Sequence, residues 1–451
     1  MQLQIYNTLT RKKEVFKPLK GNKINLFCCG PTTYGFIHIG NACTYTRFDF
    51  IVKYLRYRKF NVFYLMNITD IDDKIIKKAK EENTDWKSVT KKYEKAFYED
   101  IKILGIDSAD KFANATDYIP EIVSQVKRLV SNYYGYKISD GYYFDASKFK
   151  EYGKLAKRTY TEADDGVSRI DENPEKRNKA DFCLWKFKKG NDPFWETELG
   201  AGRPGWHIED TAITEKFFGP QYDIHGGGSD LIFPHHEAEI AQMESISGKP
   251  LVRYWMHAGM INMNERKMSK SLGNIVSARD LLSKYGSKLI RYLFLSNHYR
   301  SQLGFSEEIM NDIKNSLQRI QEFILKLKKG KDTKESDKLL KKAKEKFIQE
   351  LDDDLNTPQA LAVLFNLIRD LNKIKSGGKR VLKFFEEINE FFGFLEFKEE
   401  KIPEEIKDLV QKREKARKEN NFKEADKLRN LIKEKGYLIE DTSGKTIVKR
   451  L

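Results

Sequence analysis

A strand, a turn, a helix and a second strand occupy residues 23–68, and this unit constrains the fold more than any other part of the chain. Residues 23–29 (KINLFCC) read as a short strand, and the turn GPTTYGFIHIGN follows. The next segment places apolar residues at i, i+3, i+4 and i+7, one face of a helix. These are Phe48, Ile51, Val52 and Leu55. Residues 61–68 (NVFYLMNI) form a second apolar strand. The unit predicts an α/β fold that opens a doubly wound parallel sheet, with its functional edge at the carboxyl ends of the strands.

The charge balance narrows the class of partner. The 451 residues include 82 Lys and Arg against 67 Asp and Glu, a formal net charge of +15. Such a basic excess favours a polyanionic partner, of which nucleic acid is the commonest. The alternative is a lysine-rich proteome with no such partner.

Cysteine usage and hydropathy indicate the compartment. The four cysteines, Cys28, Cys29, Cys43 and Cys183, are too few to be the disulfide framework of a chain this long, so free thiols in a reducing compartment are expected. The N-terminus has no apolar signal region, and no run of about 18 apolar residues occurs. We expect a soluble, cytoplasmic protein without a membrane partner, and a monomer, because nothing in the sequence marks an interface.

Reactive residue types are distributed unevenly. All seven His lie between His38 and His298, and His, Cys and Trp are absent after residue 300, so chemistry is expected in the first two thirds. Residues 150–205 are irregular and suggest an insertion, whereas residues 330–348 look exposed or linker-like. Helical periodicity returns after about residue 280, with one apolar face at Leu361, Leu364, Phe365 and Ile368.

A separate basic module is expected near the C-terminus. It starts near Pro403 and ends in a hairpin with Ser443 and Gly444 at its turn. The predicted architecture is therefore a Rossmann-type doubly wound catalytic domain with an insertion, followed by an α-helical bundle and a small C-terminal module. The predicted boundaries are 1–115 and 200–275 for the catalytic domain, 116–199 for the connective insertion, 276–310 for a linking region, 311–400 for the helical bundle and 401–451 for the C-terminal module.

Two short motifs point to phosphate chemistry. HIGN, residues 38–41, lies where the first helix begins, and a helix N-terminus presents free N–H groups and a positive dipole end to phosphate. Gly40 lets a nucleotide approach the backbone closely. KMSKSLGN, residues 267–274, places two lysines three residues apart with serine between them, a cationic clamp for a leaving pyrophosphate. No P-loop is present, so this pair is the phosphate apparatus that the sequence offers.

These motifs resemble those of the class I aminoacyl-tRNA synthetases, and further segments narrow the resemblance. NITDIDDKI (67–75), GRPGWHIE (202–209), HGGGSDLIFPHHEAEIAQ (225–242), YWMHAGM (254–260) and the C-terminal KEADKLRNLIKEKGYLIEDT are together similar to cysteinyl-tRNA synthetases. The similarity covers nearly the whole chain.

The resemblance implies a cysteine–tRNA ligase that uses ATP with Mg²⁺, forms cysteinyl adenylate and pyrophosphate, and transfers cysteine to the 3′ end of its tRNA. The helical part and the basic tail would hold the tRNA, with the linking region near its stem and the C-terminal module near its anticodon. It implies His38, Asn41, Lys267 and Lys270 as the catalytic residues. It also implies ATP contacts at Gly40, Gly226, Gly227 and Ser269, and cysteine contacts at Cys29, Gly30, Thr69, Trp206 and Asp230.

The resemblance further implies a Zn²⁺ site that distinguishes cysteine from serine through its sulfur. Its ligands fall on Cys29, Asp210, His235 and Glu239, where Asp210 stands in place of the cysteine usual in the family. Aspartate ligates zinc through oxygen, so a harder site is expected, with lower zinc affinity or with acceptance of a different divalent ion. The alternative is a metal-free pocket that recognises the thiol by shape, with Thr69 and Trp206 as its walls.

Two other functions stay open at this stage. The chain could be a related ligase that transfers cysteine to a small amine, although the long helical C-terminal part argues against it. It could also be a non-catalytic tRNA-binding paralogue, although the intact HIGN and KMSKS motifs argue against that.

Overall fold

The computed structural model describes residues 2–158, 173–263, 266–267, 277–397, 403–442 and 445–450. The chain divides into two compact units, Met1–Leu395 and Glu396–Leu451. Within the described ranges, no helix combines the length and the apolar composition needed to cross a membrane.

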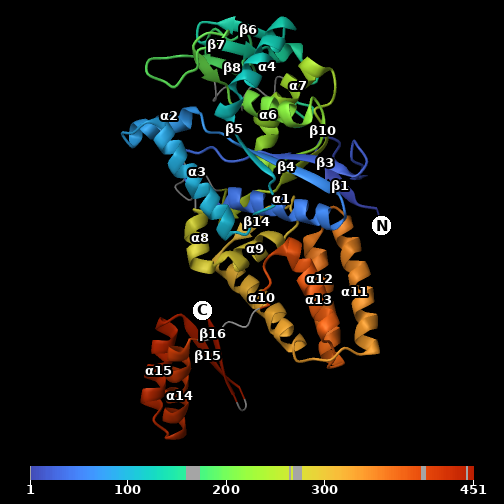
Figure 1. Cartoon of the computed structure of the whole chain (residues 1–451), viewed down its shortest axis with the longest axis vertical. Coiled ribbons are helices and arrows are strands. Elements are labelled where there is room, and N and C mark those ends of the chain that lie inside the picture. The colour runs from blue at the N-terminus through green and yellow to red at the C-terminus, as the bar shows by residue number, and fades with distance from the viewer. Residues whose placement is uncertain are drawn as a thin grey trace. The chain divides into compact units, whose positions relative to one another are not determined.

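A five-stranded parallel sheet forms the centre of the first unit (Figure 1), in the order β11–β10–β3–β4–β5. Its strands are β3 (Lys23–Cys28), β4 (Asn61–Ile68), β5 (Lys111–Asn114), β10 (Tyr222–Gly228) and β11 (Val252–Ala258). The predicted doubly wound parallel sheet is confirmed. Because β10 pairs with β3, residues far apart in the sequence meet at the carboxyl ends of neighbouring strands.

Helix α1 (Ile39–Tyr57) joins β3 to β4 and packs against both β4 and β10. Its predicted apolar face is confirmed, because all four residues of that face are buried. Helices α6 (Ile208–Phe218) and α7 (Glu237–Ser247) share an apolar core with this sheet, while α2 (Asp73–Glu81) and α3 (Trp86–Ile103) follow β4 and pack on each other. A two-stranded ribbon, β1 (Gln4–Asn7) and β2 (Lys12–Val15), precedes the sheet, and β1 contacts β11.

A second sheet lies in the predicted insertion. Its strands are β6 (Gly135–Ile138), β7 (Gly141–Phe144), β8 (Phe182–Phe187) and β9 (Gly202–Pro204), paired antiparallel in that order. Helix α4 (Ile119–Ser131) shares an apolar core with it, in which the rings of Phe144 and Phe182 stack 5.0 Å apart. The prediction of an irregular segment over 150–205 is therefore wrong for β8 and β9, whose burial comes from cross-strand partners rather than from local pattern.

Helices follow the sheets. A small sheet of β12 (Ile261–Met263), β13 (Arg266–Lys267) and β14 (Leu303–Phe305) leads into them. The helices are α8 (Ala278–Tyr285), α9 (Ser287–Leu295), α10 (Glu307–Leu327), α11 (Lys334–Asp352), α12 (Thr357–Lys373) and α13 (Lys379–Phe392). Residues 330–348 are predicted to be exposed or a linker; the linker alternative is wrong from residue 334, because α11 begins with a capping box and buries Leu340, Ala343 and Phe347, while most other residues of its first four turns are exposed.

Arg291 of α9 ties the helices to the sheet layer. Its guanidinium pairs with Asp49 of α1, donates from Nε to the Phe392 carbonyl at 2.5 Å and donates from Nη1 to the Leu104 carbonyl at 3.2 Å. The side chains of Arg291 and Asp49 are almost wholly buried.

Replacing Arg291 with methionine is expected to lower the free energy of unfolding by about 3 kcal/mol, because it removes the buried cation that pairs with Asp49 and the donor to several carbonyls. Lys53, 3.1 Å from Asp49, offsets part of the loss. Urea denaturation measures the change. Arg253→Met, at an exposed position, is the matched control, with an expected change within about 0.5 kcal/mol. Equal midpoints for the two variants would contradict this role for Arg291.

The second unit contains two helices and a hairpin. They are α14 (Glu404–Lys418), α15 (Phe422–Glu434), β15 (Tyr437–Thr442) and β16 (Lys445–Arg450). The two strands pair antiparallel, so the predicted hairpin is confirmed, while Ser443 and Gly444 at its turn lie outside the described residues. Ile406, Val410, Ile432 and Ile439 form a small core of its own.

Candidate active site

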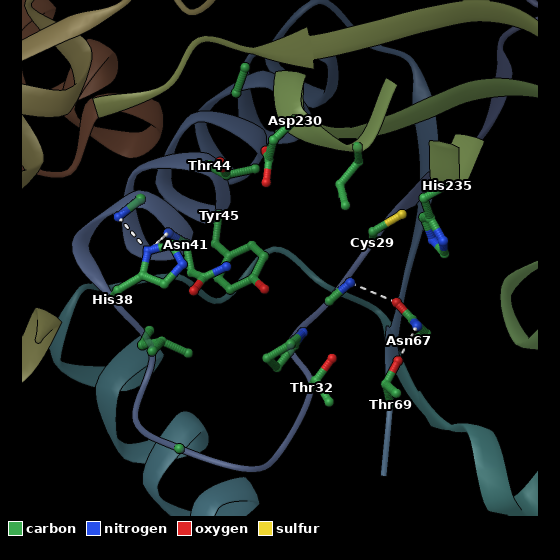
Figure 2. Close-up of a pocket in the computed structure, with 18 of the residues that line it drawn as sticks. Cys29, Thr32, His38, Asn41, Thr44, Tyr45, Asn67, Thr69, Asp230 and His235 are labelled. Atoms are coloured by element: carbon green, nitrogen blue, oxygen red, sulfur yellow. Dashed lines mark hydrogen bonds between the residues drawn. The ribbon is translucent and has the colours of Figure 1, made fainter. Parts of the chain in front are cut away.

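A cavity of about 380 Å³ opens at the carboxyl edge of the parallel sheet. It is lined by the residues that follow β3, β4 and β11, by the end of β10 and by the N-terminus of α1. Figure 2 shows Cys29 and His235 at one end of it and His38 and Asn41 at the other. The cavity therefore joins two groups of predicted site residues that are distant in sequence.

His38 caps helix α1 at one end of the cavity. Its Nδ1 accepts hydrogen bonds from the backbone N–H groups of Gly40 and Asn41, at 3.1 and 3.3 Å. These two donors are therefore satisfied by the imidazole rather than left open, as the sequence had suggested. Because Nδ1 acts as an acceptor, a neutral His38 ring carries its proton on Nε2, which makes Nε2 a hydrogen-bond donor. His38, Gly40 and Asn41 all line the cavity.

The remaining predicted phosphate contacts are Ser269, Lys270, Lys267 and the glycines of β10. Ser269 and Lys270 lie outside the described residues, and of Lys267 only the backbone in β13 is described. Gly226 and Gly227, predicted as ATP contacts, lie in β10, whose last three residues are 226–228. A Cβ on Gly226 would lie 2.2 Å from the Phe48 ring, and one on Gly227 would lie 2.9 Å from His236. Close packing explains both glycines, and Gly228 is the one that lines the cavity.

The predicted cysteine contacts Cys29, Gly30, Thr69 and Trp206 lie toward the opposite end, whereas Asp230 lies beside Thr44, between the two ends (Figure 2). Cys29, Gly30, Thr69, Trp206 and Asp230 all line the cavity. The Trp206 ring stacks on His235 with centroids 4.4 Å apart. The Cys29 end therefore offers a thiol, an aromatic wall and a hydroxyl, and the Asp230 carboxylate lies between this end and His38.

Asn67, at the end of β4, links the two sides of this end and is absent from the predicted site. Its Oδ1 accepts from the N–H of Gly30 at 2.6 Å, and its Nδ2 donates to Asp210 Oδ1 at 2.6 Å. The second bond leaves Asp210 Oδ2 directed toward Cys29 and His235. The segment NITDIDDKI carries this residue, but a single amide at a strand end has no pattern that marks it.

The four predicted metal ligands lie together. Cys29, Asp210, His235 and Glu239 each offer one ligand atom, and these atoms lie within 4.8 Å of one another. Asp210 Oδ2 is 3.4 Å from Cys29 Sγ and 3.0 Å from His235 Nε2, and Glu239 Oε1 is 2.9 Å from that nitrogen. All four side chains are buried, and neither oxygen of Glu239 accepts a well-formed hydrogen bond from the described residues. A buried thiol, an imidazole and two carboxylates, of which Glu239 has both oxygens unsatisfied among the described residues, fit a divalent cation.

Burial and the carboxylates control protonation here. Burial disfavours the charged His235 ring, yet Glu239 and Asp210 outweigh it and raise the pKa of His235 to about 10. Burial also raises the pKa of Glu239 to about 8, although His235 opposes the shift. Burial and the nearby Asp210 carboxylate raise the pKa of the Cys29 thiol well above its usual value. Without a cation this thiol stays protonated, so ligation requires a positive charge that displaces its proton.

Four further buried histidines surround this end and are absent from the predicted site. They are His207, His225, His236 and His257, and burial lowers the pKa of each of them. Each lies in a segment quoted for the resemblance, which is the signal that could have found them. Their rings are neutral at ordinary pH and so are able to act as ligands or as hydrogen-bond partners.

Solved structures with a similar fold include two aminoacyl-tRNA synthetases. The chain aligns with Mycobacterium tuberculosis methionyl-tRNA synthetase in complex with methionyl-adenylate at a TM-score of 0.60 and 17% identity, over 82% of this chain and 87% of the other. It aligns with the LeuRS–tRNA–LeuAMS ternary complex of Agrobacterium radiobacter K84 at a TM-score of 0.61 and 10% identity, over 83% and 84%. At these identities the likeness concerns the fold.

Family models extend along the chain. The model for the class I (C) tRNA synthetase catalytic domain matches residues 15–315, a DALR domain matches 346–396, and a cysteinyl-tRNA ligase anticodon-binding domain matches 399–448. Together with the parallel sheet and its cavity, the first match defines a class I aminoacyl-tRNA synthetase.

Two relatives narrow the class. The cysteine–tRNA ligase of Thermococcus gammatolerans is 41% identical over 475 residues, covering all of both chains, and that of Thermoplasma volcanium is 45% identical over 449 residues, covering 98% of this chain and 99% of the relative. The chain belongs to the cysteine–tRNA ligase family. Neither the small-amine ligase nor the non-catalytic paralogue is favoured by full-length relatives of this kind.

Proposed function

We propose that this enzyme activates L-cysteine with ATP in the cavity of Figure 2 and transfers it to the 3′ end of the tRNA for cysteine. The proposal rests on one observation: the same cavity has a buried cluster that contains a thiol at one end and the capped N-terminus of α1 at the other. The membership in the cysteine–tRNA ligase family supports the same activity.

The first step needs positioning and charge neutralisation more than acid–base help. The cysteine carboxylate attacks the α-phosphorus of ATP, a carboxylate–phosphorus bond forms, and the bond to pyrophosphate breaks. His38 Nε2–H and the Asn41 amide lie at the end of the cavity where phosphate oxygens would receive these donors. Lys267 and Lys270, with Ser269, would hold the departing pyrophosphate, and Mg²⁺ would accompany the ATP.

The second step transfers cysteine to RNA. A ribose hydroxyl at the 3′ end of the tRNA attacks the acyl carbon of the adenylate, and AMP leaves. The Asp230 carboxylate would accept hydrogen bonds from the ammonium group of the substrate cysteine. Thr69 and Trp206 would form the walls around its side chain. The backbone of Gly30 lies beside these walls. Its N–H donates to Asn67 Oδ1, and this hydrogen bond fixes its position.

Recognition of the thiol is assigned to Zn²⁺ held by Cys29, Asp210, His235 and Glu239. When bound there, the ion would supply a Lewis acid that prefers the sulfur of cysteine to the oxygen of serine. The protein's own contribution is orientation: Asn67 fixes the Asp210 carboxylate, and the Trp206 ring fixes that of His235. A shape-selective pocket without metal would separate cysteine from serine by only about 1–3 kcal/mol.

The helical and C-terminal parts are assigned to tRNA. The proposed boundaries remain those predicted from the sequence, with the bundle over 311–400 and the anticodon module over 401–451. From Lys401 to Leu451 the chain has a net charge of +5, from 15 Lys and Arg against 10 Asp and Glu, which suits phosphate contacts. A monomeric, cytoplasmic enzyme is part of the proposal.

Two assays test this function. Cysteine-dependent ATP–pyrophosphate exchange is expected, with serine at least about 100-fold less effective, and labelled cysteine should be attached to purified tRNA for cysteine. A chain that forms the adenylate but charges no tRNA would instead be a ligase acting on a small amine. Absence of both activities would overturn the proposal.

A further inference from the structure

A second group of potential ligands lies behind the cavity. Cys29, His225, His236 and Glu239 each present one ligand atom, and these atoms also lie within 4.8 Å of one another. All four side chains are buried, the last three almost completely. We call this group the inner quartet and the set with Asp210 and His235 the outer quartet. The two quartets share Cys29 and Glu239, so they are alternative positions for one ion.

The spacing within the inner quartet suits a tetrahedral ion. Cys29 Sγ lies 3.5 Å from His225 Nε2 and 3.1 Å from His236 Nε2, and His225 Nε2 lies 3.2 Å from Glu239 Oε2. Zn–S bonds of about 2.3 Å and Zn–N bonds of about 2.0–2.1 Å place the ligand atoms of a tetrahedral site about 3.3–3.6 Å apart. The inner ligands therefore need little movement to accept a cation.

The far side of each inner imidazole is held as metal ligands require. His225 Nδ1 lies 2.6 Å from the hydroxyl of Tyr222, and His236 Nδ1 lies 2.8 Å from His257 Nε2. His257 Nδ1 in turn lies 2.8 Å from the Thr8 hydroxyl. When His257 donates to Thr8, its Nε2 accepts from His236 Nδ1–H, which leaves His236 Nε2 as a free lone pair facing the thiol. Partners of this kind orient metal-ligating histidines.

Glu239 is arranged to serve both positions. Its Oε1 lies 2.9 Å from His235 Nε2 in the outer quartet, and its Oε2 lies 3.2 Å from His225 Nε2 in the inner one. A carboxylate that already points one oxygen to each side can exchange between the two without a change of rotamer.

The donor types rank the two positions. The inner quartet offers one sulfur, two imidazole nitrogens and one oxygen, whereas the outer quartet offers one sulfur, one nitrogen and two oxygens. Zinc prefers nitrogen and sulfur to carboxylate oxygen in closed four-coordinate sites. We infer that the inner quartet is a second zinc position, and that it holds the ion in the enzyme without cysteine.

Cysteine binding would reverse the ranking. The substrate thiolate can reach only the outer position, which lines the cavity through Cys29, Asp210 and His235. A second sulfur there gives the ion two sulfur ligands, so the ion moves outward as cysteine binds. The movement of the ion on cysteine binding rests on the proposed function. Occupancy of the inner quartet without substrate does not.

X-ray absorption at the zinc edge tests the inference on the full chain loaded with one equivalent of Zn²⁺. Without cysteine, the expected shell contains one sulfur and two imidazoles. With saturating cysteine, it contains two sulfurs and one imidazole. A substrate-free shell with one imidazole would overturn the inner position. Two imidazoles together with absent cysteine-dependent exchange would leave the inner position standing and overturn the proposed function.

A matched pair of variants gives an independent readout. His257→Gln removes the partner of His236, and His207→Gln removes the partner of His235, whose Nδ1 lies 2.9 Å from His207 Nδ1. Neither residue is a ligand in either quartet. In competition with a chelator, His257→Gln is expected to weaken substrate-free Zn²⁺ binding about 10- to 100-fold, and His207→Gln less than about threefold. The opposite order would assign the resting ion to the outer quartet.

Discussion

Replacing Cys29 with serine is expected to remove bound Zn²⁺ and to lower cysteine-dependent ATP–pyrophosphate exchange by at least about 100-fold. Cys29 is the one sulfur donor shared by both quartets, so a hydroxyl in its place leaves either position with nitrogen and oxygen alone. Even partners outside the ligand shell change metal affinity about 10- to 100-fold. Metal content by elemental analysis and the exchange rate measure the two effects.

Cys28→Ser is the matched control for that variant. Cys28 is the neighbouring residue and is also fully buried, but it belongs to neither quartet. It should cost stability through the buried hydroxyl while retaining one equivalent of zinc. If Cys29→Ser kept its metal and exchanged within about threefold of the wild type, thiolate ligation at this site would be refuted, and recognition of cysteine by shape would become the better account.

The opening unit of the fold was predictable from local pattern. Phe48, Ile51, Val52 and Leu55 fall on one helical face, and all four are buried in α1. Strands buried on both faces read as continuous apolar runs, as residues 61–68 do. These signals are local, because each depends on residues within two turns or one strand of each other.

What local pattern missed depends on pairing between distant segments. β8 gains its order from β7 and β9, and nothing in its own composition specifies those partners. In α11 the many lysines of the exposed face made the segment look polar throughout, although Leu340, Ala343 and Phe347 form a buried stripe. Both errors arise because tertiary contacts decide burial where intrinsic preference is weak.

The candidate site shows the same division. His235 and Glu239 are four residues apart, and their shared direction follows from helical spacing. Asn67 contacts Gly30 and His225 contacts Cys29 because β4 and β10 flank β3, a strand order that no local pattern specifies. The resemblance predicted ATP contacts at Gly226 and Gly227, yet close approach of the Phe48 ring explains why position 226 is glycine. Sheet order, rather than any motif, assembles the metal cluster.

Replacing His38 with alanine is expected to lower the maximal rate of ATP–pyrophosphate exchange about 100- to 1000-fold, the usual cost of removing one preorganised donor to developing charge. The same change removes the N-cap of α1, where Nδ1 accepts from Gly40 and Asn41. Loss of a cap costs about 1 kcal/mol of stability. A slow variant could therefore reflect either the missing donor or a frayed helix.

His38→Asn separates the two roles. Asparagine is among the preferred N-cap residues, so its short side chain should keep the melting temperature near that of the wild type. It places no donor where the imidazole Nε2–H stands, so exchange should remain slow, by about 100-fold, although the helix is intact. Thermal unfolding and exchange kinetics on the same preparations give both readouts. Recovery of the rate together with stability would show that His38 acts only as a cap, because the asparagine variant shares the cap and lacks the imidazole.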